Sequence, residues 1–223
     1  MHTIFRLCLI ATLLSLECAW ADAPRRFDLT IPNLGVVKSQ VRDYYADGSY
    51  KADVQRVTQA AQSYLEQNLR RYALMKPALV LDIDETAVSN LGYFRQYDLA
   101  YLAQEFNAWI ELGQSPAIPE VLDLYRWSRA HGVAVFFVSG RLEKQRGATD
   151  RNLRQAGYLD WQELVLKPEG GNDPSSQFKP AQRKRIIEQG YAILANLGDQ
   201  ESDLSGGYAD AQFKLPNPIY WIP

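Results

Sequence analysis

Five short apolar segments alternate with helical patterns after residue 77, and this alternation constrains the fold more than any other feature of the chain. The segments are residues 78–81, 133–138, 164–166, 191–197 and, with a weaker pattern, 211–215. Amphipathic helical patterns cover residues 120–130, 142–155 and 181–189. Strands that are apolar on both faces and alternate with helices are typical of a parallel sheet covered on both sides. The sequence therefore predicts an α/β fold with a Rossmann-like, doubly wound parallel sheet.

Two further segments are predicted to be helical and to form a small lobe beside the sheet. Apolar residues between positions 54 and 72 fall at helical spacing and indicate one long amphipathic helix that ends before Pro77. An aromatic-rich insertion follows the first strand at about residues 87–119. Aromatic residues at helical spacing belong to a core more often than to a ligand-binding surface, so we expect a core, with a stacking surface as the alternative.

The first 23 residues are predicted to be an export signal. An apolar run at residues 7–16 is followed by small residues that offer cleavage sites after Ala21 or Ala23. Because this run is roughly half the ~20 residues that a membrane-spanning helix needs, cleavage is favoured over a stable membrane anchor. We therefore expect a periplasmic or secreted protein. Its predicted organisation is a signal peptide at residues 1–23, a helical segment at 24–76, and an α/β core at 77–223 that contains the insertion.

Composition excludes several classes of protein. A formal net charge of -2 over 223 residues offers no basic surface for a nucleic acid polymer and no polybasic membrane patch. Cys8 and Cys18 both lie in the signal peptide, so the mature chain would have neither a disulfide nor a cysteine nucleophile. His2 leaves with the same peptide, and His131 lies at the end of a helical pattern, where it is expected to cap backbone carbonyls. Carboxylates and metals that prefer oxygen ligands are the chemistry that remains.

Polar residues stand at or near the ends of four predicted strands. They are Asp82, Asp84, Glu85 and Thr86 after the first strand, Ser139, Gly140 and Arg141 after the second, Lys179 at the start of the helix after the third, and Asp199 and Asp203 after the fourth. In an open parallel sheet, ligands bind beyond the carboxyl ends of the strands, where such residues converge. Each signal alone is more often structural than functional, but four in this order favour a site.

These residue types suit a phosphoryl group. Carboxylates of Asp82 and Asp199 on neighbouring strands would repel each other in a partly dry site unless a cation or a proton neutralises them. Hard oxygen ligands with a few retained waters suit Mg²⁺. Ser139 and the amide of Gly140 can hydrogen-bond a phosphoryl oxygen, and Lys179 supplies a positive charge. The constellation therefore predicts a phosphoryl site.

The order of these motifs resembles that of the haloacid dehalogenase (HAD) superfamily. The stretches "LDIDETAVSN", "GYAILANLGDQESDL" and "FKLPNPIYWIP" are similar to sequences of its acid phosphatase branch. This branch includes class B and class C bacterial enzymes, plant acid phosphatases and vegetative storage proteins. The resemblance covers the chain from about Leu34 to its end. It implies an exported, Mg²⁺-dependent phosphomonoesterase that works through a phospho-aspartate intermediate.

The resemblance also assigns roles by position. Asp82 matches the nucleophile, and Asp84 the general acid and base, whose backbone carbonyl also binds the metal. The metal ligands would be Asp82, Asp84, Asp199 and Asp203. Asp84 is expected to be kept protonated by its acidic surroundings, whereas Glu85 is expected to point to solvent or to pair with a loop cation.

The remaining matches concern phosphate binding. Thr86 matches a threonine that supports the first loop, and Ser139 and Gly140 match the second motif. Lys179 matches the third-motif lysine, and Lys167 is its rival because the preceding loop is long.

The expected substrate is a small phosphomonoester, with nucleotides as a candidate class. Two alternatives stay open at this point: a catalytically weak phosphate-binding or storage-type protein on the same fold, and a phosphotransferase. Oligomeric state stays open as well.

Overall fold

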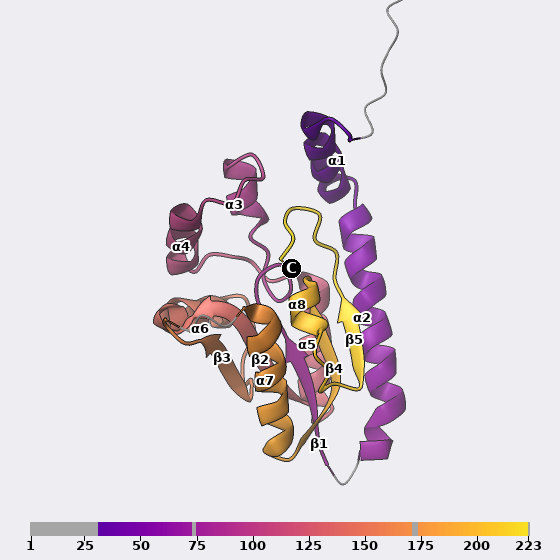
Figure 1. Cartoon of the computed structure of the whole chain (residues 1–223). Coiled ribbons are helices and arrows are strands. Elements are labelled where there is room, and N and C mark those ends of the chain that lie inside the picture. The colour runs from indigo at the N-terminus through magenta and orange to yellow at the C-terminus, as the bar shows by residue number, and fades with distance from the viewer. Residues whose placement is uncertain (1–30, 73–74, 171–173, 223) are drawn as a thin grey trace, which may run out of the picture.

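Five parallel strands form the centre of the molecule, in the order β3-β2-β1-β4-β5 (Figure 1). The structure, a computed structural model, describes residues 31–72, 75–170 and 174–222. The strands are β1 (Lys76–Leu81), β2 (Ala134–Leu142), β3 (Glu163–Lys167), β4 (Tyr191–Gly198) and β5 (Ala211–Lys214). Each neighbouring pair runs parallel. All five predicted strands are present, and the predicted α/β class is confirmed.

Helices connect the strands. They are α1 (Leu34–Ala46), α2 (Ser49–Asn68), α3 (Leu91–Gln96), α4 (Ala103–Leu112), α5 (Pro119–Ala130), α6 (Arg146–Gln155), α7 (Ser175–Glu188) and α8 (Glu201–Leu204), with short 3₁₀ turns at Leu69–Tyr72 and Glu143–Gln145. The long predicted helix corresponds to α2 and the turn after it. Helix α7 begins earlier than its apolar pattern indicates, so Lys179 lies inside the helix and not at its start. His131 caps α5 as expected, with Nδ1 2.8 Å from the carbonyl oxygen of Trp127.

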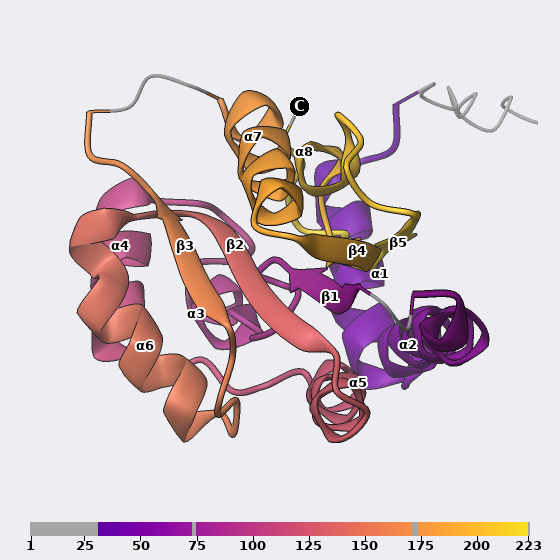
Figure 2. The ribbon, with the colours of Figure 1, turned by 90° about the horizontal axis from the view of Figure 1, so that it is seen from below.

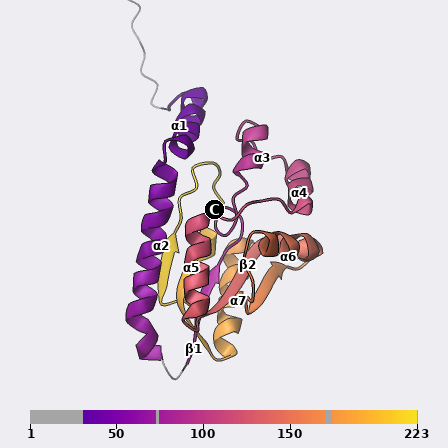
Figure 3. The ribbon, with the colours of Figure 1, turned by 180° about the vertical axis from the view of Figure 1, so that it is seen from behind.

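The sheet is covered on both faces. Helices α2, α5 and α6 pack on one face and α7 on the other, as Figure 2 shows along the strands and Figure 3 shows from behind. In β1, Leu79 and Leu81 belong to the larger core, whereas Ala78 and Val80 belong to the smaller core under α7. Full burial of a leucine side chain contributes roughly 1.5–3 kcal/mol. Because both faces of these strands are buried, apolar residues are favoured at every position, and the strands appear in the sequence as continuous apolar runs.

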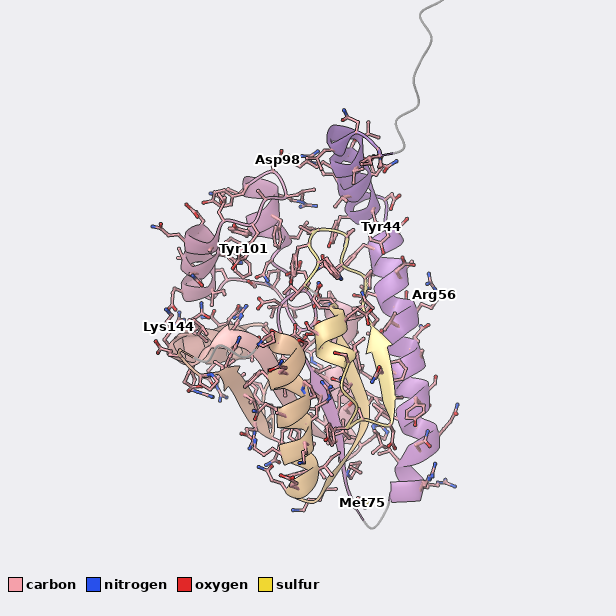
Figure 4. The ribbon with its side chains drawn as sticks, viewed as in Figure 1. Tyr44, Arg56, Met75, Asp98, Tyr101 and Lys144 are labelled. Atoms are coloured by element: carbon pink, nitrogen blue, oxygen red, sulfur yellow. The ribbon has the colours of Figure 1, made fainter. Side chains whose placement is uncertain are left out.

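The insertion forms a separate aromatic cluster above the sheet. Tyr93, Phe94, Phe106 and Ile110 of α3 and α4 are buried against one another. Asp98, in the loop after α3, forms ion pairs with Lys38 and Arg42 of α1, which brings the insertion and the first helix together (Figure 4). The N-terminal helical segment thus serves two regions, since α1 meets the insertion and α2 packs on the sheet.

Sheet topology brings the motif residues to one edge. Leu81, the last residue of β1, is in register with Phe137 of β2 and with Leu197 of β4. Asp82 and Asp199 therefore leave neighbouring strands side by side. The chain moves from β1 to β2 and β3 in one direction and then returns to β4 on the other side. The two aspartates stand at the point where this direction reverses, which is where open α/β sheets bind ligands.

The predicted signal peptide at residues 1–23 lies outside the described residues. Among the residues that are described, no helix combines the length and the apolar character needed to cross a membrane.

Candidate active site

Three buried carboxylates form the centre of the site. Oxygen atoms of Asp82, Asp199 and Asp203 lie within 4.8 Å of one another, and each residue is at most 6% exposed. Asp82 follows β1, Asp199 follows β4, and Asp203 lies in the short helix α8. Asp203 is fixed in that helix because its Oδ2 accepts a hydrogen bond from the backbone N–H of Gln200 at 2.8 Å. The sequence prediction that these three residues converge agrees with this geometry.

Lys179 lies beside this cluster. Its Nζ is 2.6 Å from Oδ1 of Asp82 and also forms an ion pair with Asp203. Burial alone would lower the pKa of Lys179, but the charges of Asp82 and Asp203 outweigh burial and raise it, so the side chain stays protonated. Lys167, the rival for this position, ends β3 and is not among the residues that line the cavity above the carboxylates.

The cluster holds more negative than positive charge. Burial raises the pKa of Asp82 well above its usual range, and Asp203 and Asp199 add to this effect against the opposing charge of Lys179. Burial and then the charge of Asp203 raise the pKa of Asp199 to about 6. Three carboxylates around one ammonium group need further positive charge or protons in a dry site. An all-oxygen donor set of this kind fits a hard divalent cation.

Asp84 is held by Arg141. Arg141 Nη2 lies 2.7 Å from Oδ1 of Asp84, and Asn90 Nδ2 donates to the same oxygen at 2.8 Å. Burial alone would raise the pKa of Asp84, but the charge and hydrogen bonds of Arg141 outweigh burial and lower it. The expectation that acidic neighbours keep Asp84 protonated is therefore wrong for this structure, because it did not include the arginine at the end of β2.

Glu85 is buried and does not point to solvent. It is 2% exposed, and its carboxylate accepts hydrogen bonds from the backbone N–H of Asn90 at 2.6 Å and from the hydroxyl of Tyr220 at 3.2 Å. Its backbone has φ 53°, a left-handed conformation that few residues adopt without compensation. Burial, followed by the charges of Asp84 and Asp199, raises the pKa of Glu85 to about 8. Its role is to join the first motif to the C-terminal end of the chain.

Ser139 and Gly140 reach the site through an irregularity in β2. Pairing between β2 and β3 shifts register between Val138 and Leu142, so the intervening residues leave the regular ladder. Ser139 and Gly140 both line the cavity. Ser139 Oγ accepts a hydrogen bond from the backbone N–H of Arg141 at 3.2 Å, which fixes the turn.

The assignment of Thr86 to phosphate binding is corrected by its position. Thr86 is fully buried, and its hydroxyl donates to Oδ1 of Asp199 at 3.1 Å. Unlike Ser139 and Asp199, Thr86 is not among the residues that line the cavity, so its hydroxyl is not placed to reach a ligand there. The threonine therefore supports Asp199 and, through it, the carboxylate cluster.

Close backbone packing fixes the position of Asp203. A Cβ atom on Gly198 would lie 2.2 Å from Cβ of Asp203, so only glycine fits at the end of β4. On the other side, the buried guanidinium of Arg183 donates to the carbonyl oxygens of Asp203, Ser205 and Gly207. Burial lowers the pKa of Arg183 to about 10. The loop that carries Asp203 is therefore held from both sides.

A cavity of about 590 Å³ opens above the carboxylates. Asp82, Asp84 and Lys179 form part of its polar lining. Aromatic residues form another part: Phe94, Tyr101 and Phe106 from the insertion, and Tyr220 and Trp221 from the C-terminal end. Tyr101 lies between α3 and α4 (Figure 4) and is 58% exposed. The core interpretation of the insertion aromatics therefore holds for Phe94 and Phe106, which are buried residues that also line the cavity.

Sequence reasoning missed several residues that hold the site. Asn90 connects Asp84 and Glu85 to Trp109 and Ser115, whose side chains donate to its Oδ1 at 3.0 and 2.7 Å. Asn217 donates to Asp199 at 2.8 Å. Both asparagines lie inside the sequence motifs quoted for the family resemblance, and only that resemblance could have indicated them. Neither follows from hydrophobic periodicity.

The geometry agrees with comparisons to known proteins. The family model described as HAD superfamily, subfamily IIIB (Acid phosphatase) matches residues 23–223. The chain is 36% identical over 190 residues to a stem 28 kDa glycoprotein of Glycine max, covering 81% of this chain and 73% of that protein. It is 35% identical over 189 residues to acid phosphatase 1 of Solanum lycopersicum, covering 82% and 73%.

Among solved structures, the class C acid phosphatase from Bacillus anthracis has a similar fold. The TM-score is 0.69 at 23% sequence identity, and the match covers 83% of this chain and 86% of that one. At this identity the likeness concerns the fold, and it supports the α/β architecture described above.

Proposed function

Because the chain belongs to the acid phosphatases of HAD subfamily IIIB, a family of phosphomonoesterases, we propose that it hydrolyses small phosphomonoesters with Asp82 as nucleophile and Mg²⁺ as cofactor. One observation carries this proposal. The carboxylate of Asp82 lines a cavity, with the ammonium group of Lys179 and two further carboxylates beside it. The site thus brings together a nucleophile, a cationic partner for phosphoryl oxygens and a set of oxygen ligands.

The residues that would hold the cation are Asp82, Asp199 and Asp203, with the backbone carbonyl of Asp84 as a further ligand. When bound, a divalent cation offsets the negative charge of the carboxylates and of a phosphoryl group. Burial, with the charges of neighbouring carboxylates added to it, raises the pKa values of Asp82 and Asp199, and a cation bound there would offset both effects.

The first chemical step is displacement at phosphorus. An oxygen of Asp82 attacks the phosphorus atom in line, an O–P bond to the carboxylate forms, and the bond between phosphorus and the ester oxygen breaks. The leaving alkoxide takes a proton from Asp84, which must therefore bind a proton before this step. Lys179 stabilises the charge on the phosphoryl oxygens, while Ser139 and the Gly140 amide bind them.

The second step returns the enzyme to its starting state. Asp84, now ionised, accepts a proton from a water molecule, and the resulting nucleophile attacks the phosphorus of the aspartyl phosphate. The bond between phosphorus and the Asp82 oxygen breaks, which releases inorganic phosphate and the free carboxylate. Arg141 keeps the Asp84 carboxylate in one orientation throughout.

The aromatic lining of the cavity favours substrates whose leaving group carries a flat ring. Tyr101 is 58% exposed and Trp221 is 73% exposed, and both line the cavity. Exposed aromatic faces beside a phosphoryl site can stack on an aryl group or a nucleobase. Nucleoside monophosphates and aryl phosphates are therefore the proposed substrate class.

A phosphomonoester panel tests the proposal. The purified protein is incubated with aryl, nucleoside and sugar phosphates in MgCl₂ or in EDTA, and inorganic phosphate is measured. We expect release in MgCl₂, with aryl and nucleoside esters preferred, and loss in EDTA. Added glycerol separates hydrolysis from phosphotransfer, because a transferase would form glycerol phosphate. Phosphate binding without turnover of any ester would instead favour the storage-type alternative.

Export is proposed from the first 23 residues. The mass of the protein recovered outside the cytoplasm is expected to correspond to a chain that begins near Ala23 or Pro24. Recovery of the full-length chain from the cytoplasm would contradict this part of the proposal.

A further inference from the structure

The end of the chain returns to the active site. After β5, residues 217–222, which we call the C-terminal strap, pass over the carboxyl end of the sheet toward α8 (Figure 1). The strap is tied there at both ends. Asn217 Nδ2 donates to Oδ2 of Asp199 at 2.8 Å, and the backbone N–H of Ile222 donates to Gln200 Oε1 at 2.8 Å. The strap therefore touches the carboxylate cluster directly.

Hydrogen bonds to Asp199 are divided unequally between its two oxygens. Oδ2 accepts from Asn217 and from Gln200 Nε2, the latter at 2.6 Å. Oδ1 accepts from the hydroxyl of Thr86 at 3.1 Å. A carboxylate oxygen has two lone pairs in its plane, so two donors occupy Oδ2, whereas Oδ1 keeps a lone pair beyond the contact with Thr86. The amide donors thus fix the rotation of the carboxylate and leave Oδ1 as the oxygen available to a cation.

Asn217 is itself rigid. Its side-chain oxygen accepts a hydrogen bond from the backbone N–H of Ile219 at 2.9 Å, with a longer contact of 3.4 Å from that of Tyr220. These contacts determine which end of the amide is the oxygen, because backbone donors face one end and a carboxylate faces the other. The strap therefore turns around the same side chain that holds Asp199.

We propose that Asn217 is a positioning residue that presents Asp199 to the divalent cation, so that cation affinity depends on the C-terminal strap. The inference rests on the proposed function, because it assumes that Asp199 is a metal ligand. Partners that hold metal ligands in place typically change metal affinity by about 10–100-fold when they are removed. Asn217 is such a partner, although it lies 18 residues from Asp199 in the sequence.

The test is Mg²⁺ binding by the purified protein and by Asn217→Ala, measured by calorimetric titration with MgCl₂ alone. We expect Kd to rise by about 10–100-fold in the variant. Asn217→Leu, which is close to asparagine in shape and has no donor, should behave in the same way and serves if the alanine variant does not fold. Gln212→Ala, an exposed amide on β5, is the matched control and should bind as the parent does.

A second measurement separates positioning from a general loss of structure. With an aryl phosphate as substrate, excess MgCl₂ should restore most of kcat in Asn217→Ala, while KM for the ester at saturating Mg²⁺ stays close to that of the parent. A folded variant with an unchanged Kd for Mg²⁺ would overturn the role of Asn217 and leave the proposed function intact. If the parent protein itself does not bind Mg²⁺, the proposed cofactor fails instead.

Discussion

Arg141 holds both carboxylate oxygens of Asp84, with Nη2 2.7 Å from Oδ1 and Nε 3.0 Å from Oδ2. The arginine side chain is 1% exposed and also donates to Thr149 at 3.2 Å, so the pair is fixed from the side of α6. This contact joins the ends of β1 and β2. It orients the proposed proton donor next to Asp82 and also favours its ionised form.

Replacement of Arg141 by methionine should therefore change the pH profile. The arginine lowers the pKa of Asp84, and only protonated Asp84 can donate to the leaving group, so kcat should fall as pH rises through that pKa. Without the guanidinium group of Arg141 the pKa of Asp84 should rise, and the falling limb of the profile should move to higher pH. The absolute rate should decrease, because the carboxylate loses its fixed orientation. A profile that keeps its position in a folded Arg141→Met variant would argue against Asp84 as the proton donor.

Lys179 and Lys167, the two candidates for the third-motif lysine, can be compared directly by mutation. Lys179→Met removes the ammonium group that contacts Asp82 and Asp203, and we expect hydrolysis to fall by about 10²–10³-fold, the usual effect of one lost stabilising donor. Lys167→Met is the matched control, because Lys167 does not line the cavity. The measurement is the initial rate of hydrolysis of one aryl phosphate by each of the two variants. Equal losses in both variants would contradict the assignment of Lys179.

Gly198 is predicted to be required for the geometry of α8. In Gly198→Ala the new methyl group would lie 2.2 Å from Cβ of Asp203, so the helix must shift, at a cost of about 1–3 kcal/mol in the free energy of unfolding. Affinity for Mg²⁺ should fall in the same variant. Gly147→Ala is the control: its Cβ meets nothing within 4 Å, and a helical alanine should stabilise by roughly 0.5–1 kcal/mol. Urea titration of both variants measures the difference.

The sheet and the motif residues could be predicted from the sequence because both depend on local patterns. Continuous apolar runs indicate strands buried on both faces, and β1 to β4 fall where those runs lie. Polar residues directly after such runs must converge at one edge of a parallel sheet, and Asp82 and Asp199 do so.

Hydrogen bonds between distant segments could not be predicted in this way. Glu85 is buried because Asn90 and Tyr220 bind it, and Tyr220 is 135 residues away. Thr86 reaches Asp199 over a similar separation. Helix α1 lies within the helical segment predicted at residues 24–76 but was not predicted as a separate helix, since Val41 is its one buried residue among those described, and a helix with so little buried surface has a weak apolar pattern.

Asp82 is the nucleophile in the proposed mechanism, and the decisive measurement is the rate of aryl phosphate hydrolysis by Asp82→Asn in saturating MgCl₂. An amide has nearly the same shape as the carboxylate but cannot form the acyl phosphate, so we predict a loss of at least about 10³-fold with the circular dichroism spectrum unchanged. If a folded variant hydrolyses the ester at the parent rate, Asp82 is not the nucleophile.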